Sequence, residues 1–440
     1  MKPVYKIIFV VMLLVGYNKS FSQENNARLL TMQDAFELAV KNSEQLKVSA
    51  INTDLAHQKV EITKLARLPE ISSGLNYGYL SNSQIWNSSF DKLGTKPIPH
   101  TLTQFSVQAS EAIFAGGQID NNIKKANLEE QVAVLAHDKN IEDIKFLVAA
   151  KYLDIYRLIN QRQVYVDNIK LSQERLKNIL TLQKQGIVTN NDVLRTKLII
   201  SDLELAVRKT DDNIQILNQQ LNTVLGLDLN EVLIPDSGLL KYSLKDDDIK
   251  SLMSEALENN KELKTASKEI EVAQTNLKIV SAERYPKIGL FAANNLQRPY
   301  TYSTPALDVY YNNWIVGVSI SYNISSFYQS PRKIKAGKIQ VEQSVAKEIV
   351  QKQNVEVEVN ADLVKFNEAK YELNTYTGDL QSAEENYRIV EKKYFNQLAL
   401  LTDLIDATNT KIEAELKISN ARINVVFAHY QLEKSIGLLQ

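Results

Sequence analysis

The chain switches between helical and strand-like spacing of its apolar residues, and it does so twice. From about 32 to 67, apolar residues recur on one broad face with helical spacing, up to the motif Arg67-Leu68-Pro69. Proline cannot donate to a continuing helix and disfavours helix at the residue before it, so the helix is predicted to end there. Two alternating runs follow, at 70–86 and 101–114, and each has an apolar face and a face rich in Ser, Asn, Gly and Gln. They predict two half-apolar strands.

A much longer helix follows these strands. Residues 118–185 contain neither proline nor glycine, and their apolar residues recur at steps of three, four and seven, which is typical of the seam of a packed or coiled helix. At about 1.5 Å per residue such a helix could reach about 100 Å. A shorter helix is predicted at 192–225, and a linker at 228–250.

The second half of the chain repeats the first. Residues 39–71 fall on 256–288 at a shift of 217 positions without a gap, and residues 192–227 fall on 403–438 at a shift of 211. The period is far longer than that of solenoid repeats, so it indicates a duplicated domain half. The predicted organisation is a signal peptide at 1–22, a first repeat at 23–227, the linker, and a second repeat at 251–440 with a helix at 249–284, strands at 287–297 and 313–324, a long helix at 332–395 and a helix at 402–436.

The first 22 residues read as a secretory signal. Lys2 and Lys6 precede an apolar run of nine residues, Ile7–Val15, and small residues place the cleavage site before Gln23. Nine residues are too few to span a bilayer, which needs roughly 20. We therefore expect an exported protein whose signal is removed.

Composition narrows the chemistry. The net charge is −1, which gives no basic field for nucleic acid, and the absence of cysteine excludes disulfides, thiolate sites and the acylated cysteine of a lipoprotein. The four histidines are scattered, and no metalloprotease, hydrolase, P-loop or dinucleotide fingerprint occurs. We expect no enzyme activity, no cofactor and no metal site.

The strands favour a membrane barrel. In such a barrel the apolar face of each strand meets lipid and the polar face lines a wet lumen. Tyrosine and tryptophan gather near the predicted strand ends, as an interfacial girdle would. Four strands cannot close a barrel, since the smallest have about eight, and open edges are not tolerated in lipid. Several chains must therefore contribute strands.

The order of these motifs resembles one family. The chain resembles the TolC-type outer-membrane efflux proteins in the order of its elements, which is duplicated. That order is helix, R-x-P-x-I, strand, loop, strand, long helix, G-x-V-x-x-x-D-V turn and a short helix ending in L-G. The resemblance covers essentially the whole mature chain, and its most specific part is Thr402–Thr410. It implies an α+β membrane protein: a homotrimer whose 12-stranded barrel in the outer membrane of a Gram-negative bacterium continues into a long periplasmic helical barrel.

The resemblance also implies partners and a function. The protein would be the exit duct of a tripartite efflux or type I secretion system, receiving cargo from an inner-membrane pump through a periplasmic adaptor. The cargo stays open. An alternative is a trimeric helical stalk or adhesin anchored in the outer membrane, although a stalk would carry its barrel at one end rather than in the middle of each repeat.

Four residues are candidates for a gate. Asp403 and Asp406 share a helix face, since they are three residues apart. They could simply be acids that suit a helix start, with Thr402 as N-cap, but the resemblance implies rings of carboxylates that narrow the entrance. Asp192 could likewise cap its helix. The resemblance implies instead that Asp192 and Tyr394 hold neighbouring helix pairs together.

Two helix–helix turns are the candidate adaptor contacts. The second departs from the family pattern, because Gln397 stands where glycine is usual and Ala399 where some members carry arginine. The candidate docking residues are Gly186, Ile187, Val188, Thr189, Gln397, Leu398, Ala399, Leu400 and Leu401, and the helix-to-strand junctions are Arg67, Pro69, Arg284 and Pro286.

Overall fold

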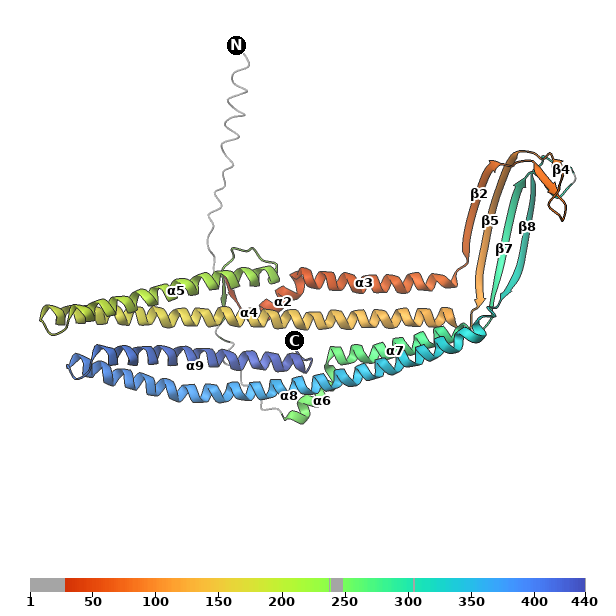
Figure 1. The fold of residues 1–440 in the computed structure, drawn as a ribbon. Coiled ribbons are helices and arrows are strands. Elements are labelled where there is room, and N and C mark those ends of the chain that lie inside the picture. Colours follow the sequence, from red (N-terminus) through yellow and green to blue (C-terminus); the bar gives the residue numbers. More distant parts are fainter. Residues whose placement is uncertain (1–27, 237, 239–247, 304, 440) are drawn as a thin grey trace, which may run out of the picture. The chain divides into compact units, whose positions relative to one another are not determined.

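A computed structural model describes residues 28–236, 238, 248–303 and 305–439 (Figure 1). The predicted signal peptide at 1–22 therefore lies outside the described residues. The described chain is mostly helical, with one four-stranded sheet and two small sheets. None of its described helices is long and apolar enough to cross a membrane.

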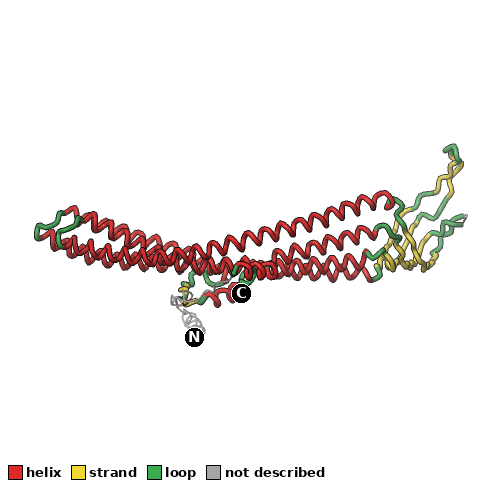
Figure 2. The backbone as a smooth tube through the Cα atoms, turned by 90° about the horizontal axis from the view of Figure 1, so that it is seen from below, coloured by secondary structure: helices red, strands yellow, loops and turns green. Residues whose placement is uncertain are grey.

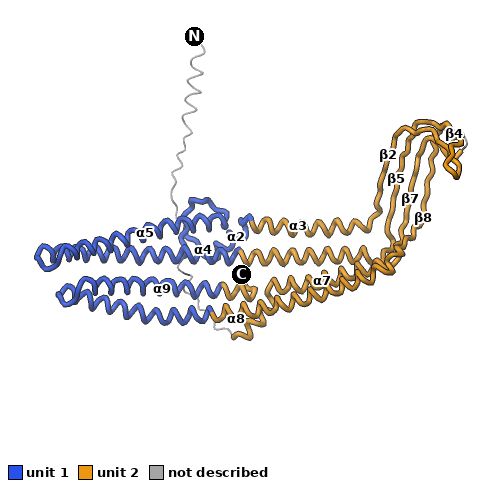
Figure 3. Tube along the Cα trace, in the orientation of Figure 1, with its two compact units in different colours: residues 1–44, 144–245, 365–430 blue, residues 45–143, 246–364, 431–440 orange. Residues whose placement is uncertain are grey.

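The chain divides into two compact units, coloured separately in Figure 3. Unit 1 holds the described residues of 1–44, 144–245 and 365–430, and unit 2 holds those of 45–143, 246–364 and 431–440. Two long helices, α4 (Gln118–Lys184) and α8 (Ser326–Phe395), contribute to both units.

Unit 1 is built from helices. The later parts of α4 and α8 are joined there by α2 (Met32–Asn42), α5 (Asn190–Leu225) and α9 (Leu401–Ser435). The apolar seam predicted for the long helix is buried in part, since Ile144, Val148 and Ile155 of α4 lie in the core.

Unit 2 joins helices to the main sheet. Its helices are α3 (Glu44–Lys64), α6 (Ile249–Asn259), α7 (Lys261–Ala282) and the first parts of α4 and α8. The strands are β2 (Glu70–Tyr79), β5 (Thr101–Phe114), β7 (Lys287–Arg298) and β8 (Tyr311–Ser321).

The main sheet is antiparallel throughout, in the order β2-β5-β7-β8. Its register places the apolar residues of all four strands in common rows, for example Ile71, Ala109, Ala292 and Val316. A row three residues further along β2 is polar and small, with Gly74, Ser106, Asn295 and Asn313. Side chains alternate across a strand, so one face of the sheet is apolar and the other largely polar.

Several predicted boundaries are corrected by the structure. The predicted strand 70–86 ends at Tyr79, and its last part is a separate strand, β3 (Ser83–Trp86). β3 pairs with β4 (Lys92–Lys96), which lies between the two predicted strands. The predicted helix 332–395 begins earlier, at Ser326, and Pro331 lies inside α8, where it removes one helix hydrogen bond. The helices predicted at 32–67 and 249–284 are each interrupted, at Ser43 and at Asn260.

At each of these two interruptions, the end of a later helix packs against the chain in the same way. Gly226, after α5, has a φ of 65°, and a Cβ there would lie 2.7 Å from the Cβ of Asn42. Gly437, after α9, has a φ of 74°, and a Cβ there would lie 2.8 Å from the carbonyl carbon of Asn259. Asn42 donates to the carbonyl of Leu225, as Asn260 does to that of Ser435. Only glycine allows such an approach with a left-handed backbone.

A small parallel sheet joins a segment before the first predicted helix to the predicted linker. β1 (Arg28–Leu30) pairs with β6 (Leu233–Pro235). Tyr152 of α4 is fully buried beside it, and its hydroxyl donates to the Leu30 carbonyl and accepts from the Asp236 N–H, both at 2.7 Å. Burial raises the pKa of the Tyr152 hydroxyl. The phenol thus ties both segments to α4.

Candidate functional site

The two helix–helix turns lie at the same end of unit 1 (Figure 2) and have the same backbone geometry. Gly186 has a φ of 74° and Gln397 one of 62°. The next N–H in each turn, of Ile187 and of Leu398, bonds back to the carbonyls of Leu182 and Lys393 at 3.0 and 2.8 Å. Both are therefore left-handed helix ends of the Schellman type. Glycine adopts this conformation without strain, whereas glutamine does so at a cost.

At the start of the helix after each turn, an aspartate in the third helical position accepts the N–H of the residue before the helix. Asp192 accepts the Thr189 N–H at 3.0 Å, and Asp403 accepts the Leu400 N–H at 2.9 Å. These bonds satisfy donors that a helix start leaves open. Thr402 is not the N-cap, because α9 already begins at Leu401. Asp406 lies one turn further on, and both it and Asp403 are exposed.

Beneath the turns lies an apolar cluster of Ile179, Val193, Tyr387, Tyr394, Leu401 and Leu404. Two predicted site residues thus belong to the core: Tyr394 and Leu401, which is 6% exposed. By contrast, Leu398 and Leu400 are 76% and 70% exposed. Of the predicted docking leucines, only these two face solvent.

Tyr394 carries a buried hydroxyl with no hydrogen-bond partner among the described residues. Burial, and then the nearby Asp192 carboxylate, raises the pKa of Tyr394. Asp192 and Tyr394, which the sequence singled out as gate residues, thus lie close together within one chain. The hydroxyl is shielded there rather than offered to a neighbour.

A buried arginine nearby was missed by the sequence analysis. Arg175 of α4 is 3% exposed, and its Nη2 donates to the Tyr387 hydroxyl of α8 at 3.0 Å. That hydroxyl in turn donates to Glu391. Burial, and then the bond to Glu391, raises the pKa of Tyr387 to about 12. The chain of bonds links a buried cation to a carboxylate through a phenol.

Spacing could have revealed this arginine. Asn168, Ser172 and Arg175 are four and three residues apart, which is the seam spacing of α4, yet all three are polar and buried. Asn168 donates to Glu415 of α9 at 2.9 Å. A polar stripe at seam spacing indicates that the helices meet through polar contacts here, which apolar periodicity alone does not show.

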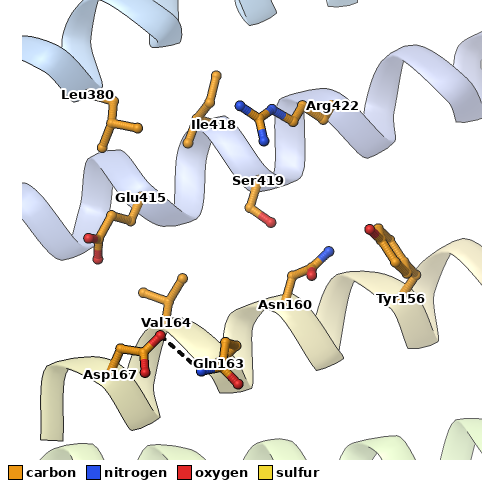
Figure 4. Close-up of a pocket in the computed structure, with 10 residues that line it drawn as sticks. All are labelled: Tyr156, Asn160, Gln163, Val164, Asp167, Leu380, Glu415, Ile418, Ser419 and Arg422. Carbon is orange, nitrogen blue, oxygen red and sulfur yellow. Dashed lines mark hydrogen bonds between the residues drawn. The ribbon is translucent and has the colours of Figure 1, made fainter. Parts of the chain in front are cut away.

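A groove of about 320 Å³ in unit 1 is lined by α4, α8 and α9 (Figure 4). Val164, Leu380 and Ile418 supply its apolar lining, and on one side Gln163 donates to Asp167 at 2.9 Å. Such a lining suits an apolar side chain or a small amphiphile rather than catalysis. Within the described residues no group of three or more His, Asp or Glu could hold a metal ion.

The helix-to-strand junctions lie in unit 2. Arg67 donates to Asp120 of α4 at 2.7 Å, just before Pro69 leads into β2. At the second junction the corresponding cross-link is Lys333 to Glu283 at 2.6 Å, while the Arg284 N–H bonds to the Ser281 carbonyl at 3.4 Å and Pro286 precedes β7. Each junction is thus pinned to the long helix that follows its strands.

Known proteins identify the class. The solved outer-membrane protein VceC of Vibrio cholerae superimposes with a TM-score of 0.74 at 14% identity, over 92% of this chain and 96% of its own. The CmeC outer-membrane channel of Campylobacter jejuni gives 0.74 at 12% identity, over 94% of this chain and 86% of its own. At these identities the likeness establishes the fold, which is that of outer-membrane channels.

The family follows from the sequence. The family model described as outer membrane efflux protein matches residues 35–227 and 252–438, and the chain belongs to this family. The outer-membrane protein TolC of Escherichia coli is 20% identical over 450 aligned positions, covering 98% of this chain and 86% of TolC. The resemblance predicted from the motifs is therefore confirmed. The protein is an outer-membrane efflux channel and not an enzyme, and nothing supports the stalk or adhesin.

Proposed function

We propose that three copies of the chain form one channel, with a 12-stranded barrel in the outer membrane and a helical tunnel in the periplasm. The channel is the exit duct of a tripartite efflux or type I secretion system, fed by an inner-membrane pump through a periplasmic adaptor. The chain reaches the outer membrane after removal of residues 1–22. One observation carries the proposal: a four-stranded sheet with a bare apolar face and two open edges.

The apolar face suits lipid. Ile71 and Leu75 of β2 and Val318 and Ile320 of β8 are all exposed, and no element of the described chain covers them. In water such a face would be costly, whereas in a bilayer it is the normal outer surface of a barrel strand. The opposite face, with Ser, Asn and Gly, suits a wet lumen.

The open edges call for further copies. β2 and β8 each pair on one side only in the described sheet. A lipid-exposed edge leaves backbone groups unsatisfied, so β8 of one copy must pair with β2 of the next until the ring closes. The family's known channels make three the number we propose.

The helices carry matching apolar stripes. On α8, Val350, Val357, Val364 and Tyr371 are exposed and seven residues apart. On α3, Val48, Leu55 and Ile62 are exposed with the same step. A seven-residue repeat of apolar residues is the seam by which helices pack side by side. These stripes supply faces for the neighbouring copies.

The turns of unit 1 form the pump-side entrance. Around a three-fold axis Asp403 and Asp406 give six carboxylates that narrow it. Leu398 and Leu400, with the exposed Ile187 of the first turn, supply an apolar surface for the adaptor. Leu401 supports this surface from the core instead of contacting the partner.

Cross-linking between copies tests the proposal. The chain has no cysteine, so Asn76→Cys in β2 and Asn313→Cys in β8 introduce the only thiols. A flexible bis-maleimide applied in detergent should give dimers and then trimers, and nothing larger, because the ring closes at three. Each single variant should stay monomeric on denaturing gels. A double variant that gives only monomers and dimers would contradict the trimer.

A further inference from the structure

The β3–β4 hairpin displays apolar side chains that no other part of the described chain covers. Ile85, Trp86, Phe90 and Leu93 are all exposed, and Phe90 is the most exposed of them at 84%. None of them belongs to the apolar rows of the main sheet. Because these side chains are exposed on a short hairpin outside the main sheet, they indicate a contact with something outside the chain.

The turn of this hairpin is built to present Phe90. Phe90 has a φ of 67°, a conformation that is costly for a bulky side chain. Its N–H donates to the Asn87 carbonyl at 3.1 Å, and the Asp91 N–H donates to Asn87 Oδ1 at 2.8 Å. Asn87 and Asp91 are also joined through their backbone at 3.0 Å. Phe90 is strained, and the hydrogen bonds of the turn hold it in place. Such strain indicates that the exposed position of its side chain has a function.

The hairpin begins at the level where the membrane surface is expected. β2 ends with Tyr77 and Tyr79 on the apolar face, both exposed, and tyrosine favours the membrane–water interface. Only residues 80–82 separate Tyr79 from β3. Figure 1 shows that the hairpin turns away from the direction of β2 and β5 instead of prolonging them. It therefore stays near that level.

The chemistry of the hairpin matches a lipid surface. Lys92 and Lys96 lie on β4, among the apolar residues. Lysine can lay its apolar stem along an acyl surface and bring its ammonium to lipid phosphates. Aromatic rings beside lysines are the usual composition of a membrane-interface anchor.

We propose that the β3–β4 hairpin docks on the outer leaflet around the barrel. Trp86, Phe90 and Leu93 enter the boundary between headgroups and acyl chains, and the lysines of β4 lie near the phosphates. The proposal rests on the proposed function, because it requires the apolar face of the main sheet to meet lipid. It adds a lipid-binding element outside the barrel wall.

The two tryptophans of the chain allow a direct test. Trp314→Phe leaves Trp86 as the only tryptophan, and Trp86→Phe leaves Trp314, which is exposed on the apolar row of β8. Each full-length variant is reconstituted into phosphatidylcholine vesicles with and without brominated acyl chains. We expect bromolipid to quench both tryptophans, and aqueous iodide to quench Trp86 weakly.

A second variant tests the role of the aromatic. Phe90→Asn in the Trp314→Phe background keeps a residue that tolerates positive φ, so the turn is preserved. We expect the loss of most bromolipid quenching of Trp86 and a gain in iodide quenching. Unchanged quenching would overturn the assignment of Phe90 as an anchor.

The remaining outcomes separate the alternatives. Strong iodide and absent bromolipid quenching of Trp86 would mean that the hairpin stands in water, and quenching by neither would mean that it packs on a second copy. Either result overturns the lipid contact. If Trp314 itself escapes bromolipid, the lipid-facing sheet fails, and the proposed function fails with it.

Discussion

Gln397 has a backbone conformation that is unfavourable for a residue with a side chain. It occupies a left-handed position that glycine fills in the equivalent first turn, at Gly186. A residue with a Cβ pays roughly 1–2 kcal/mol for this conformation. Gln397→Gly should therefore stabilise the protein by about 1 kcal/mol, seen as a higher denaturant midpoint of the helical circular-dichroism signal.

Gly186→Ala is the matched control for this change. No atom lies within 4 Å of a Cβ placed at Gly186, so the variant adds backbone strain without a clash. It should lower the midpoint by a similar amount. A midpoint that does not move in Gln397→Gly would show that the second turn relaxes at no cost.

Asp362 of α8 makes stability depend on pH. Burial raises the pKa of its carboxyl, although Gln431 donates to its Oδ1, and its Oδ2 has no hydrogen-bond partner in the described structure. An acid with a raised pKa in the folded state adds stability below its unfolded pKa, and this stability is lost as pH rises through the folded pKa. Asp362→Asn, which mimics the protonated form, should raise the free energy of unfolding at pH 7.

Urea titrations at several pH values check this expectation. The gain in Asp362→Asn should vanish below about pH 4, where the parent carboxyl is protonated in both states. Glu342→Gln, on the exposed face of the same helix, should change little at any pH. A loss of stability in Asp362→Asn at pH 7 would mean that the bond from Gln431, at 2.7 Å, outweighs the burial of charge.

Residue roles were only partly accessible from the sequence. The sequence predicts that Asp192 could cap its helix and that Asp403 suits a helix start, and both carboxylates accept an N–H at their helix starts. The N-cap predicted at Thr402 is wrong, because α9 already begins at Leu401. The burial of Tyr394 and Leu401 was not predictable, because the turn places neighbours such as Leu400 and Leu401 on opposite sides. Arg175 was missed because a periodicity analysis of apolar residues passes over a buried cation.

At the scale of elements, β8 offers adjacent residues on opposite faces. Val318 lies on the exposed apolar face, level with Leu290 of β7, and Ser319 lies on the other face, level with Gly289. Val318→Arg should cost about 2–4 kcal/mol if this row meets the bilayer near its midplane. Ser319→Arg should be tolerated if the opposite face lines a wet lumen, as proposed.

The yield of heat-resistant oligomer in outer-membrane fractions measures both variants. We expect a marked loss for Val318→Arg and near-parental yield for Ser319→Arg. The reverse order would mean that the two faces of the sheet are exchanged.

Elements with strong periodicity were predicted well. α4 spans Gln118–Lys184 where the sequence predicts 118–185, and α9 spans Leu401–Ser435 where it predicts 402–436. The β3–β4 hairpin was missed because its residues alternate weakly, and the β1–β6 pair because its strands are three residues long and about 200 positions apart. The breaks at Ser43 and Asn260 depend on the late glycines that pack there, which local spacing does not reveal.

At the scale of the whole molecule, we predict that multivalent cations block the proposed tunnel entrance. Six carboxylates from Asp403 and Asp406 around one axis would attract multivalent cations, which prefer oxygen ligands. Divalent or trivalent cations added on the tunnel side of a planar bilayer should block the current. Replacing both aspartates with alanine should relieve the block.

Trimer yield is the control for this double variant. Asp403 also caps α9, and losing such a cap costs about 1 kcal/mol, which a long helix can bear. A double variant blocked as strongly as the parent would leave these acids as helix caps only. The constriction would then lie elsewhere in the tunnel.

The number of copies is the part of the architecture that pattern could not supply. Half-apolar strands and open edges require partners for β2 and β8, and any closed ring would satisfy them. The proposed number of three copies comes from the resemblance to a family, not from residue spacing or composition.

The open edges of β2 and β8 also have a genetic meaning. In the proposed ring each copy would complete its neighbours, so one faulty chain would spoil a ring that contains sound ones. In a cell making equal amounts of sound and faulty chains, about one eighth of trimeric rings would hold sound copies alone. A barrel mutation such as Val318→Arg, if its product still enters rings, would therefore behave as dominant over the wild-type allele, whereas a mutation that prevents the chain from folding at all would be recessive.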